Sequence, residues 1–332
     1  MLKANAYGHG MKEVAKYTED IVNYFGVMSS KEGIYLRNCG ITKPILITLS
    51  DMAEFSDLVR YDLEPCIKSL TELLHLDYHG EGQNKKAEFH IKIDTGMNRL
   101  GIKDLDEFNS LLSLSKNLKH VDFKGLISHF SDNDEITSDR QNKKFQEFIS
   151  VCNGYYEDYI KQISSSHSAL LKNYRYDMVR LGLGAYGYLN DKKSERLCDV
   201  TLKPAMSVYG LVNCVKEVKR GECIGYGKDC VAEGDIKIAV IRAGYADGIK
   251  RDLTGFDVII KGKKYKIIGK ICMDMFFADV TGDDIKYGDL VTVLGSENGE
   301  SIFANDTAKY LNTIPYEILT SFNGRIERCF LV

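Results

Sequence analysis

A lysine near the start of the chain has neighbours that suit covalent chemistry on its amine. Lys3 follows an apolar residue and leads into small residues that end in Gly8-His9-Gly10. Small neighbours let a flat ligand approach the backbone, and glycines permit the positive φ angles of a tight turn. We therefore treat Lys3 as a candidate reactive amine. The ordinary alternative for any single lysine is a solvated surface position.

Hydrophobic periodicity predicts the elements that must position this lysine. A chain of 332 residues is too long for one ordinary hydrophobic core. Its length suits a barrel of roughly 200 to 250 residues plus a smaller domain. Apolar, β-branched clusters alternate with helical stripes, such as the stripe from Met11 to Val22 and the stripe from Phe145 to Cys152. Counting the segment that ends at Lys3, this pattern predicts eight strands and an α/β fold, a (β/α)₈ TIM-like barrel. The other predicted strands are 25–28, 45–49, 64–67, 89–93, 123–128, 162–166 and 176–180.

Polar residues follow several of these strands. In a (β/α)₈ barrel the chemistry lies at the C-terminal ends of the strands. The candidates at such ends are Lys3, Arg99, His129, Ser168 and Arg180. We expect these five residues to lie on one face of the barrel.

The strand predicted at 89–93 alternates apolar residues with His90, Lys92 and Asp94. Period two places the polar set on one face of the strand. If the apolar face meets the surrounding helices, the ionisable groups point into the barrel, where an unpaired charge costs several kcal/mol. They should then be paired or functional. An irregular edge strand with one solvated face is the alternative.

After Gly187 the pattern changes to alternation and hairpins, which predicts a smaller, mostly β C-terminal domain. One hairpin is predicted at 258–267 with its turn at Lys261-Gly262-Lys263, and only 305–311 and 316–322 are helical in pattern. The charged stretch 190–196 is the predicted boundary. The predicted domains are therefore 1–196 and 197–332.

Composition excludes several classes of partner. The net charge is −3 with both signs interspersed, so we expect no nucleic-acid-binding face and no membrane anchor. No apolar run approaches the roughly 20 residues of a spanning helix. The nine cysteines form no Cys-x-x-Cys pair, and Cys214, Cys223 and Cys230 have no nearby histidine, so no metal site is expected. Free thiols fit a reducing compartment, which predicts a cytoplasmic protein.

The segment Lys3–Gly10 resembles the pyridoxal-phosphate lysine segment of alanine racemases, and further similar blocks follow in the family's order. These blocks are Asp94–Ile102, Gly125–Phe130, Val179–Gly187, Gly225–Gly227, Ala243–Gly248, Gly269–Met275 and Ile314–Glu317. The resemblance implies the fold-type III architecture, with a pyridoxal 5'-phosphate-binding barrel before a β domain. It also implies an isomerase that interconverts L-alanine and D-alanine, supplies D-alanine for peptidoglycan, and works as a homodimer with shared active sites.

The resemblance implies a set of cofactor contacts. Lys3 would bond the cofactor aldehyde, Tyr7 its phosphate, and His129 would lie against the pyridine ring. Arg180 would face the pyridine nitrogen, and because an arginine does not give up its proton, that nitrogen would stay unprotonated. The remaining cofactor-binding residues would be Ser168, Gly182, Leu183 and Tyr316. His167 stands where the family has asparagine, so no role is carried over to it.

A second set of residues would handle the small amino-acid substrate. Lys3 and Tyr226 would be the two bases, although a phenol with a pKa near 10 needs nearby cations or hydrogen bonds to serve as a base. Arg99 and the backbone of Met273 would bind the substrate carboxylate. Lys92 aligns with a lysine that is carbamylated in many members, and a carbamate there would face Arg99 as an anion. Tyr245 resembles an entryway residue.

Alternatives remain open at this point. The segment Ile163–Ala169 and the ending Arg325-Ile-Glu-Arg328 are similar to the serine/alanine racemases of glycopeptide-resistance systems. Family members carry a longer segment before the lysine, so we also expect an N-terminally truncated chain. A truncated protein that binds the cofactor without turnover is the third reading.

Overall fold

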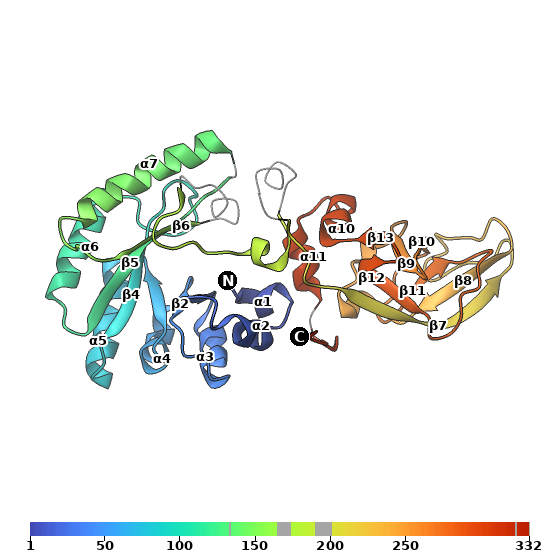
Figure 1. The fold of residues 1–332 in the computed structure, drawn as a ribbon, viewed down its shortest axis with the longest axis horizontal. Helices are drawn as coiled ribbons and strands as arrows, with labels where there is room; N and C mark the ends of the chain where they lie inside the picture. The colour runs from blue at the N-terminus through green and yellow to red at the C-terminus, as the bar shows by residue number, and fades with distance from the viewer. Residues whose placement is uncertain (133, 165–173, 190–200, 323, 332) are drawn as a thin grey trace. The chain divides into compact units, whose positions relative to one another are not determined.

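The computed structural model describes residues 1–132, 134–164, 174–189, 201–322 and 324–331. The chain forms two compact units (Figure 1). The first contains Met1–Ala6 and Gly10–Ala185, and the second contains Tyr7–His9, the segment from Tyr186, and Thr201–Val332. The predicted boundary at 190–196 lies outside the described residues.

The first unit is built on a parallel sheet in the order β1-β2-β3-β4-β5-β6. Its strands are β1 (Phe25–Val27), β2 (Ile45–Ile47), β3 (Glu64–Ile67), β4 (Ala87–Lys92), β5 (Val121–His129) and β6 (Ile160–Ser164). Consecutive strands pair in parallel, with one register shift in the β4–β5 pair at Phe89/His90, so each crossover returns the chain to the neighbouring position. Six of the eight predicted strands therefore form, each within a few residues of its predicted range.

Helices connect these strands and cover the outer side of the sheet (Figure 1). They are α2 (Met11–Thr18), α3 (Ser30–Asn38), α4 (Phe55–Arg60), α5 (Leu70–Gln83), α6 (Leu105–Asn117) and α7 (Glu135–Cys152). Side-chain oxygens of Ser29, Ser69, Asp104 and Asp134 accept backbone N–H bonds at four helix starts. The predicted stripe on α7 is confirmed, because Phe145, Phe148 and Cys152 are buried. None of the described helices is long and apolar enough to cross a bilayer.

Two of the predicted strands, the segment ending at Lys3 and 176–180, do not form as strands. They nevertheless lie along the two edges of the sheet: the Leu2 nitrogen donates to Gly26 of β1, and the Asp177 nitrogen to Lys161 of β6. The Met1 nitrogen then donates to the Leu181 carbonyl oxygen at 2.9 Å, which connects the two edges. With one or two backbone bonds each, neither segment builds a strand ladder. The parallel sheet is thus barrel-like, as predicted, with six strands rather than eight.

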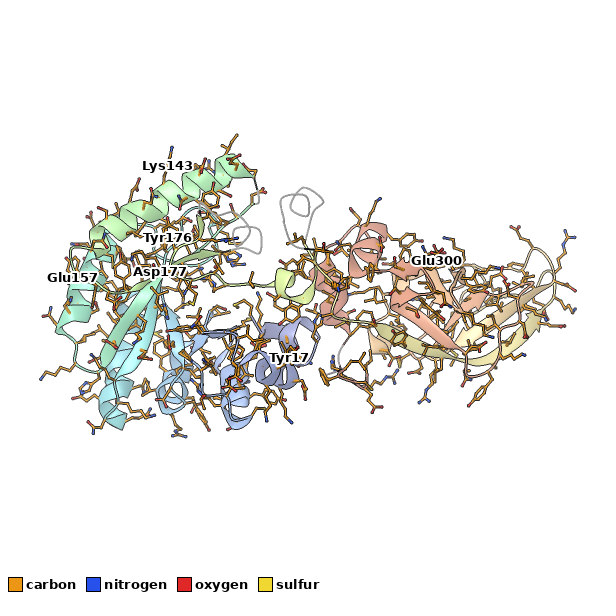
Figure 2. All side chains as sticks on the ribbon, in the orientation of Figure 1. Tyr17, Lys143, Glu157, Tyr176, Asp177 and Glu300 are labelled. Atoms are coloured by element: carbon orange, nitrogen blue, oxygen red, sulfur yellow. The ribbon has the colours of Figure 1, made fainter. Side chains whose placement is uncertain are left out.

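Side chains anchor the segment at 176–180 (Figure 2). The Tyr176 hydroxyl donates to Asn142 of α7 at 2.5 Å, and the Asp177 carboxylate accepts the Lys161 nitrogen at 2.8 Å. Arg180 lies three residues after Asp177, at the end of this anchored segment.

The prediction for the polar face of β4 is confirmed for His90. Its Nε2 lies 2.9 Å from Glu64 on β3, and both residues are buried. Asp94 is not paired across the sheet as His90 is, because it lies beyond the end of the strand. Its carboxylate accepts hydrogen bonds from the backbone nitrogens of Gly96 and Asn98. The apolar partners Phe89, Ile91 and Ile93 are fully buried.

The second unit is mostly β, as predicted, and its sheet is antiparallel in the order β13-β12-β7-β8-β11-β10-β9, with a further β12–β9 pairing. The strands are β7 (Val208–Val218), β8 (Ile236–Ile241), β9 (Asp257–Ile260), β10 (Lys263–Ile268), β11 (Phe276–Asp279), β12 (Leu290–Glu297) and β13 (Glu300–Ile302). The extra pairing closes six of them into a ring, which covers the otherwise free edge of β9. Lys261 and Gly262, both with positive φ, make the predicted hairpin turn between β9 and β10. The two predicted helices are α10 (Ala304–Tyr310) and α11 (Pro315–Ser321).

Candidate active site

The backbone after Lys3 turns in the left-handed sense. The four residues that follow it in α1 (Lys3–Tyr7) have φ angles of 53–54°, although none is glycine. The Ala6 nitrogen donates to the Leu2 carbonyl oxygen at 2.7 Å and holds the turn. Left-handed geometry costs roughly 1–2 kcal/mol for each non-glycine residue, and such strain gathers at functional sites. The turn therefore marks the segment that begins at Lys3 as a candidate site.

The Lys3 amine lies in surroundings that favour its neutral form. Burial and the nearby Arg99 guanidinium lower the pKa of Lys3 below its ordinary value, and Glu32 opposes them. Glu32 is itself held by the backbone nitrogens of Ala4 at 2.7 Å and Met28 at 2.8 Å. A neutral amine is the nucleophilic and basic form of lysine.

Arg180 is fixed by three side-chain and backbone contacts. Its Nη1 donates to the buried Gln162 amide oxygen at 2.6 Å, and its Nη2 to the Ser128 carbonyl oxygen at 2.7 Å. Its backbone nitrogen also donates to the Ser164 hydroxyl at 3.2 Å. The guanidinium thus has a set orientation at the C-terminal ends of β5 and β6.

Cationic side chains gather at this end of the sheet. Burial, followed by Arg180, lowers the pKa of Lys92 to about 7 at the end of β4. Burial and the cations Arg180, Lys92, Arg99 and Lys3 lower the pKa of His129 to about 2, so its ring is neutral at pH 7. The guanidinium groups of Arg99 and Arg180 supply the positive charge at this end of the sheet, and positive charge attracts anionic ligands. We call Lys3, Lys92, Arg99, His129 and Arg180 the basic cluster.

The second unit holds the aromatic residues that follow the left-handed turn. The Tyr7 ring lies 5.1 Å from Tyr186 and 5.7 Å from Tyr316 of α11, measured between centroids. His9 stacks on Tyr186 at 4.4 Å, and its Nδ1 lies 3.0 Å from the Tyr7 carbonyl oxygen. Gly8 has a φ of +84°, and a Cβ there would lie 2.2 Å from the Leu319 carbonyl oxygen. Only glycine fits this position.

Tyr226 lies in an exposed turn between two glycines. Gly225 and Gly227 have positive φ, and 68% of Tyr226 is exposed. An ion pair between Lys270 and Asp229 lies behind the turn, because a Cβ on Gly227 would lie 2.7 Å from the Lys270 Nζ. The Tyr226 side chain is therefore exposed to solvent, on a turn that packs against this ion pair.

Two further turns of the second unit are joined by backbone bonds. The Tyr245 nitrogen donates to the Cys272 carbonyl oxygen, and the Ala246 nitrogen to the Met273 carbonyl oxygen, each at 3.0 Å. Gly244 leaves no room for a Cβ, which would lie 2.2 Å from the same Met273 oxygen. Tyr245 and Met273 are both about half exposed on these joined turns.

The predicted site residues thus fall into two groups. The basic cluster lies in the first unit. The second unit contains Tyr7, Tyr226, Tyr245, Met273 and Tyr316. Gly182 accepts the Ala185 nitrogen, and Leu183 is buried at the start of a short turn. Ser168 and His167 lie outside the described residues. Sequence reasoning missed Gln162 and Glu64, for which the signal was a polar residue inside an apolar strand segment, and Glu32, which lies in the first turn of α3.

Comparisons with known proteins identify the family of this chain. Residues 1–190 match the model of the alanine racemase N-terminal domain, and residues 205–330 match that of the C-terminal domain. Alanine racemase 2 of Caldanaerobacter subterraneus is 34% identical over all of this chain and 87% of its own. The solved alanine racemase of Streptomyces lavendulae has a TM-score of 0.93 at 28% identity, covering 100% of this chain and 89% of its own. That of Bacillus anthracis, solved with bound L-Ala-P, has a TM-score of 0.92 at 28% identity, covering 97% and 85%. The chain belongs to the alanine racemase family.

Proposed function

We propose that this protein is a pyridoxal 5'-phosphate-dependent racemase that interconverts L-alanine and D-alanine with two bases. The observation that carries the proposal is the basic cluster, in which Lys3, with its lowered pKa, lies near the guanidinium groups of Arg99 and Arg180 at the C-terminal side of the parallel sheet. The relatives named above are alanine racemases, which favours alanine over serine as the substrate.

The donor set fits the cofactor. Pyridoxal phosphate is a flat, dianionic aldehyde, and it needs a free amine, hydrogen-bond donors and positive charge. Lys3 supplies the amine, Tyr7 a phenolic donor, and Arg180 a guanidinium with a fixed orientation. When bound, the cofactor supplies an electron sink for charge that develops at the substrate α-carbon.

In this proposal each candidate site residue has a defined role. Lys3 would hold the cofactor aldehyde through its amine, and once the substrate amine displaces it the freed amine would move the α-proton on one face of the substrate, which its lowered pKa allows. Tyr226 moves the proton on the opposite face. Arg180 would face the pyridine nitrogen and, because an arginine does not give up its proton, would leave that nitrogen unprotonated and so limit side reactions. His129, neutral and flat, would lie against the ring, while Ser168, Gly182, Leu183 and Tyr316 would complete the cofactor-binding set.

The substrate carboxylate is bound by Arg99 and by the backbone of Met273, with Tyr245 at the entry to the site. Lys92 is carbamylated in this proposal, because an amine with a pKa of about 7 is partly neutral at pH 7 and can add CO₂. The resulting anion would compensate the charge of the neighbouring arginines. We place the domain boundary at 196/197, in a cytoplasmic homodimer whose sites are shared.

Replacement of Lys3 tests the proposal. Lys3→Ala should lose the absorbance of lysine-bound cofactor and lose racemisation in both directions, because no other amine of the basic cluster has the same position. Lys12→Ala, on the exposed side of α2, is the matched control and should retain both. Both enantiomers of alanine and serine are assayed. Racemisation of serine but not alanine, or cofactor absorbance retained by Lys3→Ala, would contradict the proposal.

A further inference from the structure

The C-terminal segment carries an arginine that joins two turns of the second unit. Arg325 donates from Nε to the Asp247 carboxylate at 2.7 Å, and from Nη2 to the same carboxylate at 3.4 Å. Its Nη2 also donates to the Asp274 carboxylate. One planar guanidinium therefore bridges two carboxylates that are 27 residues apart in the chain, a geometry that lysine does not reproduce.

Both carboxylates belong to turns that the proposed function places at the substrate. Asp247 ends the short helical turn Tyr245–Asp247, and its second oxygen accepts the Gly244 nitrogen at 2.8 Å. Asp274 directly follows Met273. Because backbone bonds already join the two turns on one side, Arg325 adds a second connection and limits how they can hinge.

Arg328, three residues later, contacts a different part of the unit. Its Nε donates to the Gly8 carbonyl oxygen at 2.9 Å, and its Nη2 to the Phe322 carbonyl oxygen at 2.5 Å. Gly8 follows Tyr7 and packs against the backbone of Leu319. Arg328 thus connects the Tyr7 turn to the end of α11, while Arg325 connects the two substrate-side turns.

We propose that Arg325 and Arg328 are positioning residues: Arg325 holds the turns of Tyr245 and Met273 for substrate binding, and Arg328 holds the Tyr7 turn for cofactor binding. Neither side chain touches substrate or cofactor in this scheme. The Arg325 contacts are about half exposed, so they add little to global stability, and their effect is on local geometry. The inference rests on the proposed racemase function.

Separate readouts distinguish the two arginines. Arg325→Ala should raise the KM for alanine about fivefold to tenfold, because small displacements of positioning groups are costly, while the cofactor dissociation constant stays within about twofold. Arg325→Lys should not rescue KM. Arg328→Ala should weaken cofactor binding, followed by absorbance and by titration of the cofactor-free protein, about tenfold. Arg328→Lys should restore part of it, since an ammonium can still donate to one carbonyl oxygen. Arg220→Ala, an exposed arginine of the same unit, is the control.

The outcomes are decisive in each direction. Asp274→Asn removes one arm of the Arg325 bridge and is measured if Arg325→Ala does not fold; it should show a smaller rise in KM of the same kind. An unchanged KM in an active, folded Arg325→Ala or Asp274→Asn protein, or equal losses of substrate and cofactor binding in both arginine variants, would overturn the inference. Absence of alanine racemisation by the unmodified protein would instead overturn the proposed function.

Discussion

Replacing Lys92 by methionine removes a partly buried amine and keeps a side chain of similar length, and it should change how stability depends on pH. The pKa of Lys92 falls from the ordinary 10.5 to about 7, chiefly through burial and secondly through Arg180. Above pH 7 the unfolded lysine keeps its proton while the folded one loses it. Since the unfolded state then binds more protons, the unfolding free energy of the unmodified protein rises with pH between about 7 and 10.5. Below about pH 7 both states are protonated and this slope disappears.

The size of the effect follows from the shift. One pH unit corresponds to about 1.4 kcal/mol, so two units, from about pH 7 to about pH 9, give at most about 3 kcal/mol. Because Lys92 keeps partial access to solvent, we expect about 1–2 kcal/mol. The Lys92→Met protein has no titrating group at this position. The stability difference, unmodified minus Lys92→Met, should therefore grow by that amount over this interval.

The assay is urea unfolding of cofactor-free protein in CO₂-free buffer, followed by circular dichroism at about pH 6, 7 and 9. Lys12→Met is the control, because an exposed lysine of α2 should give a difference that does not depend on pH. Added bicarbonate should stabilise only proteins that retain Lys92 and add the mass of one CO₂ to them. A Lys92→Met difference that stays constant from pH 7 to pH 9 would refute the reasoning.

The remaining predictions concern assembly, packing and the left-handed turn. If active sites are shared in a homodimer, mixing Lys3→Ala with Tyr226→Phe should restore about a quarter of the activity through mixed dimers, whereas no recovery after demonstrated subunit exchange would exclude sharing. Arg37→Met should lower the unfolding free energy by about 2–4 kcal/mol in urea unfolding, because the guanidinium donates to four backbone carbonyl oxygens; a loss below about 0.5 kcal/mol would show that water replaces these bonds. Gly8→Ala should weaken cofactor binding and lower the melting temperature together, because its Cβ would lie 2.2 Å from the Leu319 oxygen; an unchanged melting temperature would contradict this clash.

Local patterns were sufficient for most elements of the fold. The alternation of Phe89, Ile91 and Ile93 with polar residues predicts β4 and its buried ionisable groups, because side chains of a strand point to opposite faces. The hairpin at Lys261-Gly262 follows from turn chemistry that involves only neighbouring residues. The candidate site residues themselves were named from short blocks of sequence, since a cofactor-binding segment depends on residue types at fixed spacing.

Long-range contacts decided the rest. Periodicity counts the segment at 176–180 as a strand, but whether a strand forms depends on the backbone bonds available at the sheet edge, and only one or two are made there. The left-handed turn after Lys3 contradicts the ordinary preference of alanine and tyrosine, so its geometry is imposed by surrounding structure. Likewise, the fixed orientation of Arg180 by Gln162, and the lowered pKa values of Lys92 and His129, arise from groups distant in sequence. The sequence by itself determined which residues are available for the chemistry. Only the tertiary structure decided their charge and orientation, because burial and electrostatic interactions depend on distance in space.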